Sequence, residues 1–171
     1  MQARKLIVGA VIAGAVVIGW YLFRPELLFI SRTVNEALPG SVVATNSPSG
    51  SPAIALLTGQ FHSVAHESMG QATIHRLADG KRIVRFTGFE TSNGPDVRVY
   101  LVATNDASDN DTVTRAGFVD LGALKGTKGD QNYDIPANLD LEQYRAVTVW
   151  CRRFGVNFAT APLTPENEKQ I

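Results

Sequence analysis

The stretch Tyr144–Pro162, YRAVTVWCRRFGVNFATAP, decides the fold class, and it contains the only cysteine, Cys151, beside Trp150. Apolar residues alternate before the two arginines and alternate again after them with the opposite parity. Because side chains on a strand point to alternate faces, one straight strand cannot place both sets on one face. The stretch therefore predicts either strands separated by a turn or bulge at Arg152 and Arg153, or a strand covered on both faces.

Outside this stretch, residues 54–163 consist of short apolar runs separated by turn signals. Asp79-Gly80 is a hairpin dipeptide, and Asn93–Asp96 is a second turn signal. Residues 104–114 have the composition of a polar, acidic loop, and no long amphipathic helix occurs. About 7–9 short strands with regular turn signals predict an all-β fold, either an antiparallel β-sandwich or a partly closed barrel.

Residues 6–23, LIVGAVIAGAVVIGWYLF, carry no charge and predict a transmembrane helix. Arg4 and Lys5 precede this helix and favour a cytoplasmic N-terminus, which would make the protein single-pass with an extracytoplasmic C-terminal domain. A cleaved signal peptide is the alternative, because residues 13–15 read Ala-Gly-Ala, a small-residue cleavage pattern. Both interpretations place the rest of the chain outside the cytoplasm.

We expect four parts along the chain. Residues 1–30 form the membrane anchor with a juxtamembrane segment, and residues 31–53 form a linker rich in Ser, Pro and Gly. Residues 54–163 form the β domain, and residues 164–171 form a disordered tail. The formal net charge is zero, which argues against a nucleic-acid-binding surface.

Cys151 is the first candidate site residue. Because it has no intrachain cysteine partner, it is a free thiol, a ligand or half of an intermolecular disulfide. Arg153 would lie on the same side two residues further along a straight strand, and a nearby cation favours the thiolate. A small, buried, structural cysteine is the alternative.

His66 and Met69 are three residues apart and offer an imidazole and a thioether to one metal or haem.

Several kinds of site are excluded. The sequence has no CxxCH, CxxC, HExxH or GxSxG motif, and no His or Met follows Cys151 as a blue-copper ligand set requires. The acidic residues of the 104–114 loop lack the EF-hand glycine and glutamate, so a solvated loop is expected.

His62 and His75 are expected to be solvated or hydrogen-bonded. Asp96 is expected to cap its own turn, and Tyr133 to anchor a corner through its hydroxyl.

Four phrases closely resemble the DM-thirteen domain in order and spacing. They are LTGQFHSVAHESMGQATIHRLADGKRIVRF, GFETSNGPDVRVYL, VDLGALKGTKGDQNYDIP and LDLEQYRAVTVWCRRFGVNFATAPL. The resemblance covers Leu56–Leu163, and the anchor with RPELLFI is similar to membrane-tethered bacterial members. DM-thirteen is a small β domain that also accompanies DOMON and Skeletor-type proteins.

The resemblance implies electron transfer or redox chemistry at the cell surface, exchanged with a redox partner protein and centred on Cys151. It implies either a bare thiol or ligation of a prosthetic group such as haem, and His66 falls at the family's histidine position. The second hypothesis is a non-catalytic module for binding or adhesion in the cell envelope, in which Cys151 is structural. Whether the protein is an enzyme stays open.

Overall fold

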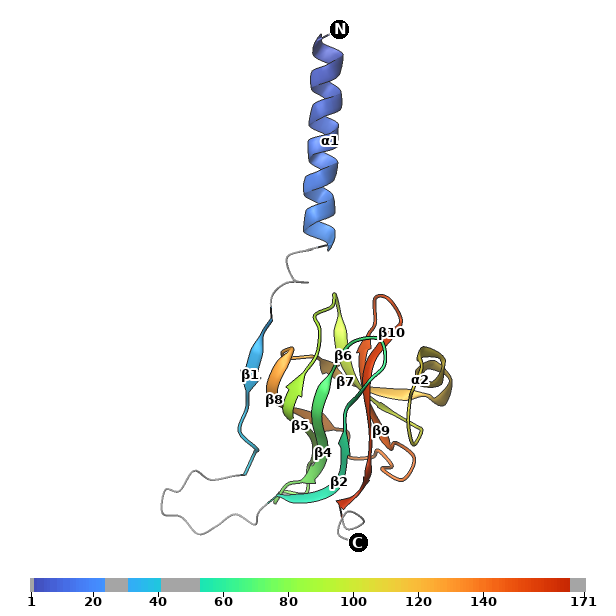
Figure 1. Ribbon diagram of the computed structural model, residues 1–171. Coiled ribbons are helices and arrows are strands. Elements are labelled where there is room, and N and C mark those ends of the chain that lie inside the picture. Colours follow the sequence, from blue (N-terminus) through green and yellow to red (C-terminus); the bar gives the residue numbers. More distant parts are fainter. Residues whose placement is uncertain (1, 24–30, 41–52, 167–171) are drawn as a thin grey trace, which may run out of the picture.

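The computed structural model describes residues 2–23, 31–40 and 53–166 (Figure 1). The expected juxtamembrane segment at 24–30, most of the expected linker and the end of the expected tail lie outside the described residues. Helix α1 (Gln2–Phe23) contains a stretch, Arg4–Tyr21, that is long and apolar enough to cross a membrane. None of this stretch is buried against the rest of the described chain.

Two β-sheets pack face to face in the C-terminal part (Figure 1). In spatial order, the six-stranded sheet consists of β1 (Thr33–Asn35), β8 (Lys128–Ile135), β5 (Arg82–Glu90), β4 (Met69–Arg76), β2 (Ile54–Gln60) and β11 (Thr164–Pro165). The five-stranded sheet consists of β3 (His62–Ser63), β10 (Val156–Pro162), β9 (Ala146–Cys151), β6 (Val97–Val102) and β7 (Phe118–Ala123). Neighbouring strands are antiparallel except β1 and β8.

The all-β sandwich prediction is confirmed, and the two sheets do not close into a barrel. The described residues contain eleven strands, more than the about 7–9 that the turn signals predict. The difference arises because β1, β3 and β11 are only two or three residues long. Strands of that length show no alternating pattern in the sequence.

Apolar side chains from both sheets meet between the layers and form the inner core. Three rings, Phe61, Phe86 and Phe89, stand at its centre with ring centroids 4.8–5.0 Å apart. Full burial of one such side chain stabilises the fold by roughly 1.5–3 kcal/mol. The inner core therefore supplies most of the packing that joins the two sheets.

The outer face of the five-stranded sheet is covered by a second, smaller apolar cluster and by α2 (Asn110–Ala116). The sequence predicts only a loop at 104–114, so this part of the prediction is wrong. Asp109 caps the helix, because its carboxylate accepts a hydrogen bond of 2.6 Å from the Thr112 amide. Val113 is the buried residue of the helix. A helix of seven residues is too short to show a helical period.

Residues 33–36 of the expected linker and Thr164 at the start of the expected tail pair with strands of the sandwich. Strand β1 pairs with β8, and Glu36 continues the pairing by donating its amide to the Asp130 carbonyl at 2.9 Å. Strand β11 pairs with β2 at the opposite edge of the same sheet. Both segments are polar, and edge strands need no apolar alternation because much of their surface faces solvent.

Candidate functional site

Cys151 is the last residue of β9 and is completely buried in the inner core. It pairs with Val97 of β6 on one side and with Val156 of β10 on the other. Residues 152–155 form a turn, so the turn explanation of the parity break is confirmed. A bulge at Phe158 then shifts the alternation of β10 by one residue. Strand β9 is also covered on both faces, so both alternatives hold.

An open cleft of about 370 Å³, here named the NGPD cleft, lies next to the strand neighbour of Cys151. It is lined by the 92–97 turn, the 123–127 loop and Arg32, and Val97 forms part of its wall. A Cβ at Gly94 would lie 2.8 Å from the side chain of Val97 and 2.9 Å from the ring of Phe158. A glycine is therefore required where the turn passes over the inner core.

Asp96 lies in this cleft with φ 109°, the only positive φ of a non-glycine residue in the described ranges. Its carboxylate accepts a hydrogen bond of 2.7 Å from Arg152 and lies 3.6 Å from Arg98. Its carbonyl accepts a hydrogen bond of 3.0 Å from the Arg152 amide. The expectation that the carboxylate caps its own turn is wrong, because the carboxylate instead joins the NGPD turn to the 152–155 turn.

Arg153 lies in the exposed turn after Cys151, and within the described chain it forms no ion pair. Because the chain turns at residue 152, Arg153 does not follow Cys151 along a straight strand. The reason for expecting a cation beside the sulfur therefore does not apply. Arg152 lies next to it and is engaged by Asp96.

His66 and Met69 lie in and after the loop between β3 and β4. The His66 ring packs on the ring of Phe158 with centroids 3.8 Å apart and is partly exposed. Met69 is 54% exposed and lines a second open cleft, of about 260 Å³, to which neither His66 nor Cys151 contributes. The structure brings His66 onto the inner core near Phe158, but it does not gather Cys151, His66 and Met69 around one space.

These donors do not fit an axially ligated haem. Cys151 is sealed, and the lining of the NGPD cleft contains no imidazole, thiol or thioether. No group of three or more His, Cys, Asp or Glu side chains with the spacing of a metal site occurs in the described ranges. A bare thiol is therefore the form of the Cys151 hypothesis that the arrangement of side chains accommodates.

The two remaining histidines have different surroundings. His62 Nε2 lies 2.9 Å from the carboxylate of Asp106, and both side chains are partly exposed. His75 is half-buried on the outer face of the six-stranded sheet, and its Nδ1 has no hydrogen-bond partner within the described chain. Burial and the charge of Arg85 lower the pKa of His75, which favours the neutral ring. The expectation of a hydrogen-bonded or solvated side chain is confirmed for His62.

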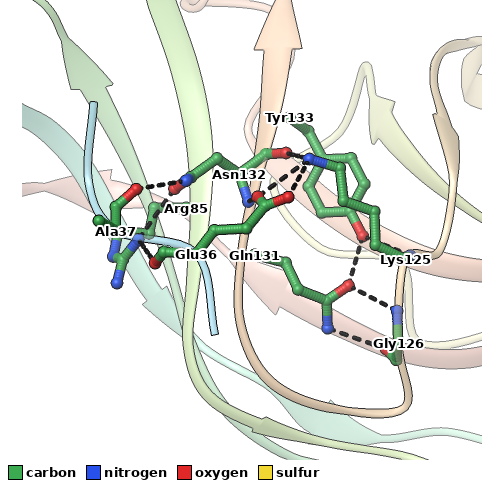
Figure 2. Close-up of polar contacts among 8 residues, drawn as sticks. All are labelled: Glu36, Ala37, Arg85, Lys125, Gly126, Gln131, Asn132 and Tyr133. Atoms are coloured by element: carbon green, nitrogen blue, oxygen red, sulfur yellow. Dashed lines mark hydrogen bonds and ion pairs between the residues drawn. The ribbon is translucent and has the colours of Figure 1, made fainter. Parts of the chain in front are cut away.

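Glu36, in the segment expected to be a linker, is the centre of a polar network on β8 (Figure 2). Its carboxylate accepts hydrogen bonds from Lys125 Nζ at 2.8 and 2.9 Å and from the Asn132 amide at 2.8 Å. Arg85 donates to the Glu36 carbonyl at 2.9 Å, and Asn132 donates to the Ala37 carbonyl at 2.9 Å. Residues 33–37 are thereby attached to the domain, a contact that no local sequence signal indicates.

The glycines of the 125–130 phrase allow this segment to approach. A Cβ at Gly129 would lie 2.2 Å from the Val34 carbonyl oxygen, and Gly129 has φ 94°. Tyr133 donates a hydrogen bond of 2.7 Å to Gln131 and accepts one of 3.1 Å from the Lys125 amide (Figure 2). Burial raises the pKa of Tyr133, so its hydroxyl stays protonated. The expected corner anchor is confirmed.

The comparisons with known proteins give one match. The family model described as electron transfer DM13 matches residues 60–163. No curated protein and no solved structure matches the chain significantly. The match covers more than half of the 171 residues and includes the NGPD turn, the 123–127 loop and the β9–β10 hairpin with Cys151. With this match over nearly the whole sandwich, the chain belongs to the DM13 family of electron-transfer domains.

Proposed function

We propose that this protein is an electron-transfer module tethered to the extracytoplasmic side of a cell membrane, with Cys151 as its redox-active group. Membership of the DM13 family supports the class of activity. The position of Cys151 carries the rest of the proposal. This only cysteine ends a strand that is buried on both faces, and it pairs with Val97 in the wall of the NGPD cleft.

Complete burial restricts the chemistry open to Cys151. A partner thiol or a metal ion cannot contact the sulfur unless the hairpin opens, whereas an electron can cross the protein without contact. In the forward step, an external one-electron acceptor is reduced, the S–H bond breaks, and the proton passes to water in the NGPD cleft. A thiyl radical remains. A one-electron donor and a proton from water restore the thiol.

His66 is the accessory group in this proposal. Its ring is partly exposed and packs on Phe158, which belongs to the same core cluster as Cys151. Its ring nitrogens can accept and donate protons, so it is suited to a proton-transfer role beside the core. Met69 and Arg153 are exposed, and we assign neither a direct contact with the sulfur.

The membrane arrangement rests on the N-terminal part of the chain. Arg4 and Lys5 at the start of the apolar stretch favour a cytoplasmic N-terminus, which puts the β domain on the other side. Nine residues separate Phe23 of α1 from Thr33 of β1, and they span at most roughly 35 Å when fully extended. Docking of β1 on β8 therefore holds the 54–163 domain close to the membrane surface.

The test is one-electron oxidation of the full chain in lipid vesicles by a light-generated ruthenium(III) complex. The sample is then freeze-quenched and thawed into urea that contains the spin trap, so that the trap reaches the buried sulfur, and the adducts are located by mass spectrometry. We expect a spin-trap adduct on Cys151 in the wild type, and none at this position in Cys151→Ala. Oxidation of the exposed Met69 to the sulfoxide shows that the oxidant reached the protein. An unmodified Cys151 in a chain whose Met69 is oxidised would overturn the redox role of the sulfur.

A non-catalytic envelope-binding module is the second candidate, and it is favoured by the sealed position of Cys151 beside an open cleft with no redox-active lining. In that case Ala123→Trp, which places a large ring in the NGPD cleft, would abolish sedimentation of the detergent-solubilised full chain with insoluble envelope material. Cys151→Ala would leave that sedimentation unchanged. The reverse pattern would exclude this candidate.

A further inference from the structure

Three aromatic rings form a stack from the surface to the strand that carries Cys151. Phe118, at the start of the edge strand β7, lies parallel to Tyr100 with an interplanar angle of 3° and centroids 4.2 Å apart. Tyr100 is followed by Trp150 of β9, with centroids 6.3 Å apart and an angle of 27°. Phe118 is 43% exposed, whereas Tyr100 and Trp150 are 2% and 5% exposed. The stack therefore leads from solvent into the sheet.

Structural packing alone does not explain the polar atoms of the inner two rings. Within the described chain, neither the hydroxyl of Tyr100 nor the indole nitrogen of Trp150 has a hydrogen-bond partner, although such groups usually find one when buried. Neither atom is fully covered by protein, so each retains contact with water. Phe at position 100 would fill the same space.

Tyr and Trp are the aromatic side chains that lose one electron most readily, and both then release a proton. Burial raises the pKa of the Tyr100 hydroxyl, so the phenol is protonated before oxidation. The proton can pass to the water that the hydroxyl contacts. The neighbouring charges are paired, with Arg98 2.6 Å from Asp120 and Arg152 2.7 Å from Asp96. Each of these four charges has a partner of opposite sign, so none of them remains unpaired beside the Tyr100 ring.

Trp150 is covalently adjacent to Cys151, although their side chains point to opposite faces of β9. The stack belongs to the outer cluster, and the sulfur belongs to the inner core. One backbone unit thus separates the innermost ring from the buried thiol. A redox partner that contacts Phe118 at the sheet edge would have a continuous path of stacked rings to this point.

We propose that the Phe118–Tyr100–Trp150 stack is the route by which an electron crosses between the surface and the interior of the domain. This inference rests on the proposed function, which makes Cys151 the inner end of the route. In the oxidising direction, an external one-electron acceptor takes an electron from Tyr100, whose proton goes to solvent. Trp150 gives an electron to the Tyr100 radical and releases its indole proton to solvent, while Tyr100 regains a proton from solvent. Cys151 then reduces Trp150, which regains its proton from solvent. Per transfer, the acceptor gains one electron, the Cys151 S–H bond breaks and one proton reaches water.

The experiment measures radical formation in the full chain in phosphatidylcholine vesicles, with a light-generated ruthenium(III) complex as the oxidant. Trp20→Phe and Tyr21→Phe are present throughout, so that the rings of α1 do not contribute. Transient absorption follows the tyrosyl and tryptophanyl radicals, and spin trapping after freeze-quenching and thawing into urea follows Cys151. Tyr100→Phe keeps the ring packing but removes an oxidisable relay, and we expect the rate of Cys151 oxidation to fall about tenfold or more. Tyr144→Phe is the matched control, because Tyr144 lies outside the stack, and it should change nothing.

Cys151→Ala separates failure of the inference from failure of the proposed function. Without the sulfur, the radical should rest on Trp150, and its formation should still fall about tenfold in the Tyr100→Phe variant. Trp150 radical formation that depends on Tyr100, without any oxidation of Cys151 in the wild type, would support the stack and overturn the role of the sulfur. Oxidation of Cys151 at an equal rate in wild type and Tyr100→Phe would overturn the stack and support the sulfur.

Discussion

The two faces of β9 have different chemistry although both are buried. Toward the inner core the strand presents Val147, Val149 and Cys151, and this face meets the apolar side chains of the other sheet. Toward the outside it presents Thr148 and Trp150. The Thr148 hydroxyl lies 3.1 Å from that of Thr160, and Trp150 belongs to the aromatic stack. The inner-face side chains are covered by the other sheet, whereas the outer-face stack reaches the surface at Phe118, which is 43% exposed.

This difference separates the part of the domain that provides stability from the part to which we assign electron transfer. Apolar burial in the inner core fixes the two sheets, and its contribution scales with the area removed from water. Two peripheral parts, α2 on the five-stranded sheet and residues 33–37 at the edge of the six-stranded sheet, are attached by directed hydrogen bonds and by less apolar contact than the inner core has. Substitutions in the inner core should therefore cost more stability than substitutions in these peripheral parts.

Phe86→Ala should have the largest effect. The ring is fully buried and contacts Phe61, Phe89 and Tyr133, so its removal leaves a cavity in the inner core. We expect a loss of about 3–5 kcal/mol in the free energy of unfolding, measured by urea denaturation. Thr87→Ala, at the adjacent exposed position, is the control and should change little. A loss below about 1 kcal/mol for Phe86→Ala would contradict a tightly packed inner core.

Asn157→Ala should come next, because it releases part of the layer on the outer face of the five-stranded sheet. The Asn157 amide donates to the Ala107 carbonyl at 2.8 Å and to Thr160 at 3.0 Å. We expect a loss of about 1–3 kcal/mol and faster amide exchange in α2. Asn105→Ala, at an exposed position of the same loop, should leave both measurements unchanged. Slow exchange in α2 of the Asn157 variant would show that apolar contacts alone hold this layer.

The parts of the fold that the sequence predicts are those with local signals. The alternation around Cys151 and the turn at residue 152 predict the hairpin, and turn dipeptides predict the other connections. The Tyr133 anchor was also predictable, because its hydroxyl needs a partner when the ring is buried. These features depend on neighbours along the chain, so a single sequence contains enough information.

The missed features depend on residues far apart in the sequence. Glu36 reaches Lys125 across 89 positions, and Arg152 reaches Asp96 across 56 positions. The aromatic stack depends on the pairing of β6 with β7 and β9, which alternation within one strand does not determine. Cys151 was predictable as a buried or reactive residue, but its side of the strand relative to a cleft was not.

Phe118→Ala offers a matched comparison with Phe86→Ala, since the same chemical change is made at a partly exposed site. Phe118 is 43% exposed, and its main contact is the stack with Tyr100. We expect a loss of about 0.5–1.5 kcal/mol, the range measured for one aromatic pair. Phe118→Leu should recover part of the apolar contact but not the stacking. A loss as large as that of Phe86→Ala would mean that Phe118 itself supports the inner core.

Glu36→Gln should have the smallest effect on global stability and a local effect on the docking of β1. Burial alone would raise the pKa of Glu36, but hydrogen bonds from Lys125 and the Asn132 amide, with the charges of Lys125 and Arg85, hold it below its ordinary value. A carboxyl with a lowered folded-state pKa stabilises the fold fully above its unfolded-state pKa. That contribution is lost as the pH falls through the lower, folded-state pKa.

The measurement for Glu36→Gln is amide exchange at the β1–β8 edge of the full chain as a function of pH. In the wild type, protection of Asn132 and neighbouring amides should fall as the pH drops below the ordinary pKa of a glutamate. In Glu36→Gln the protection should be lower at neutral pH and should not change across this range, with a global loss of up to about 1 kcal/mol. Glu142→Gln, at an exposed position, is the control. An acid-dependent loss that persists in Glu36→Gln would assign the effect to another carboxylate, Asp130 beside Arg85 being the neighbour to test next.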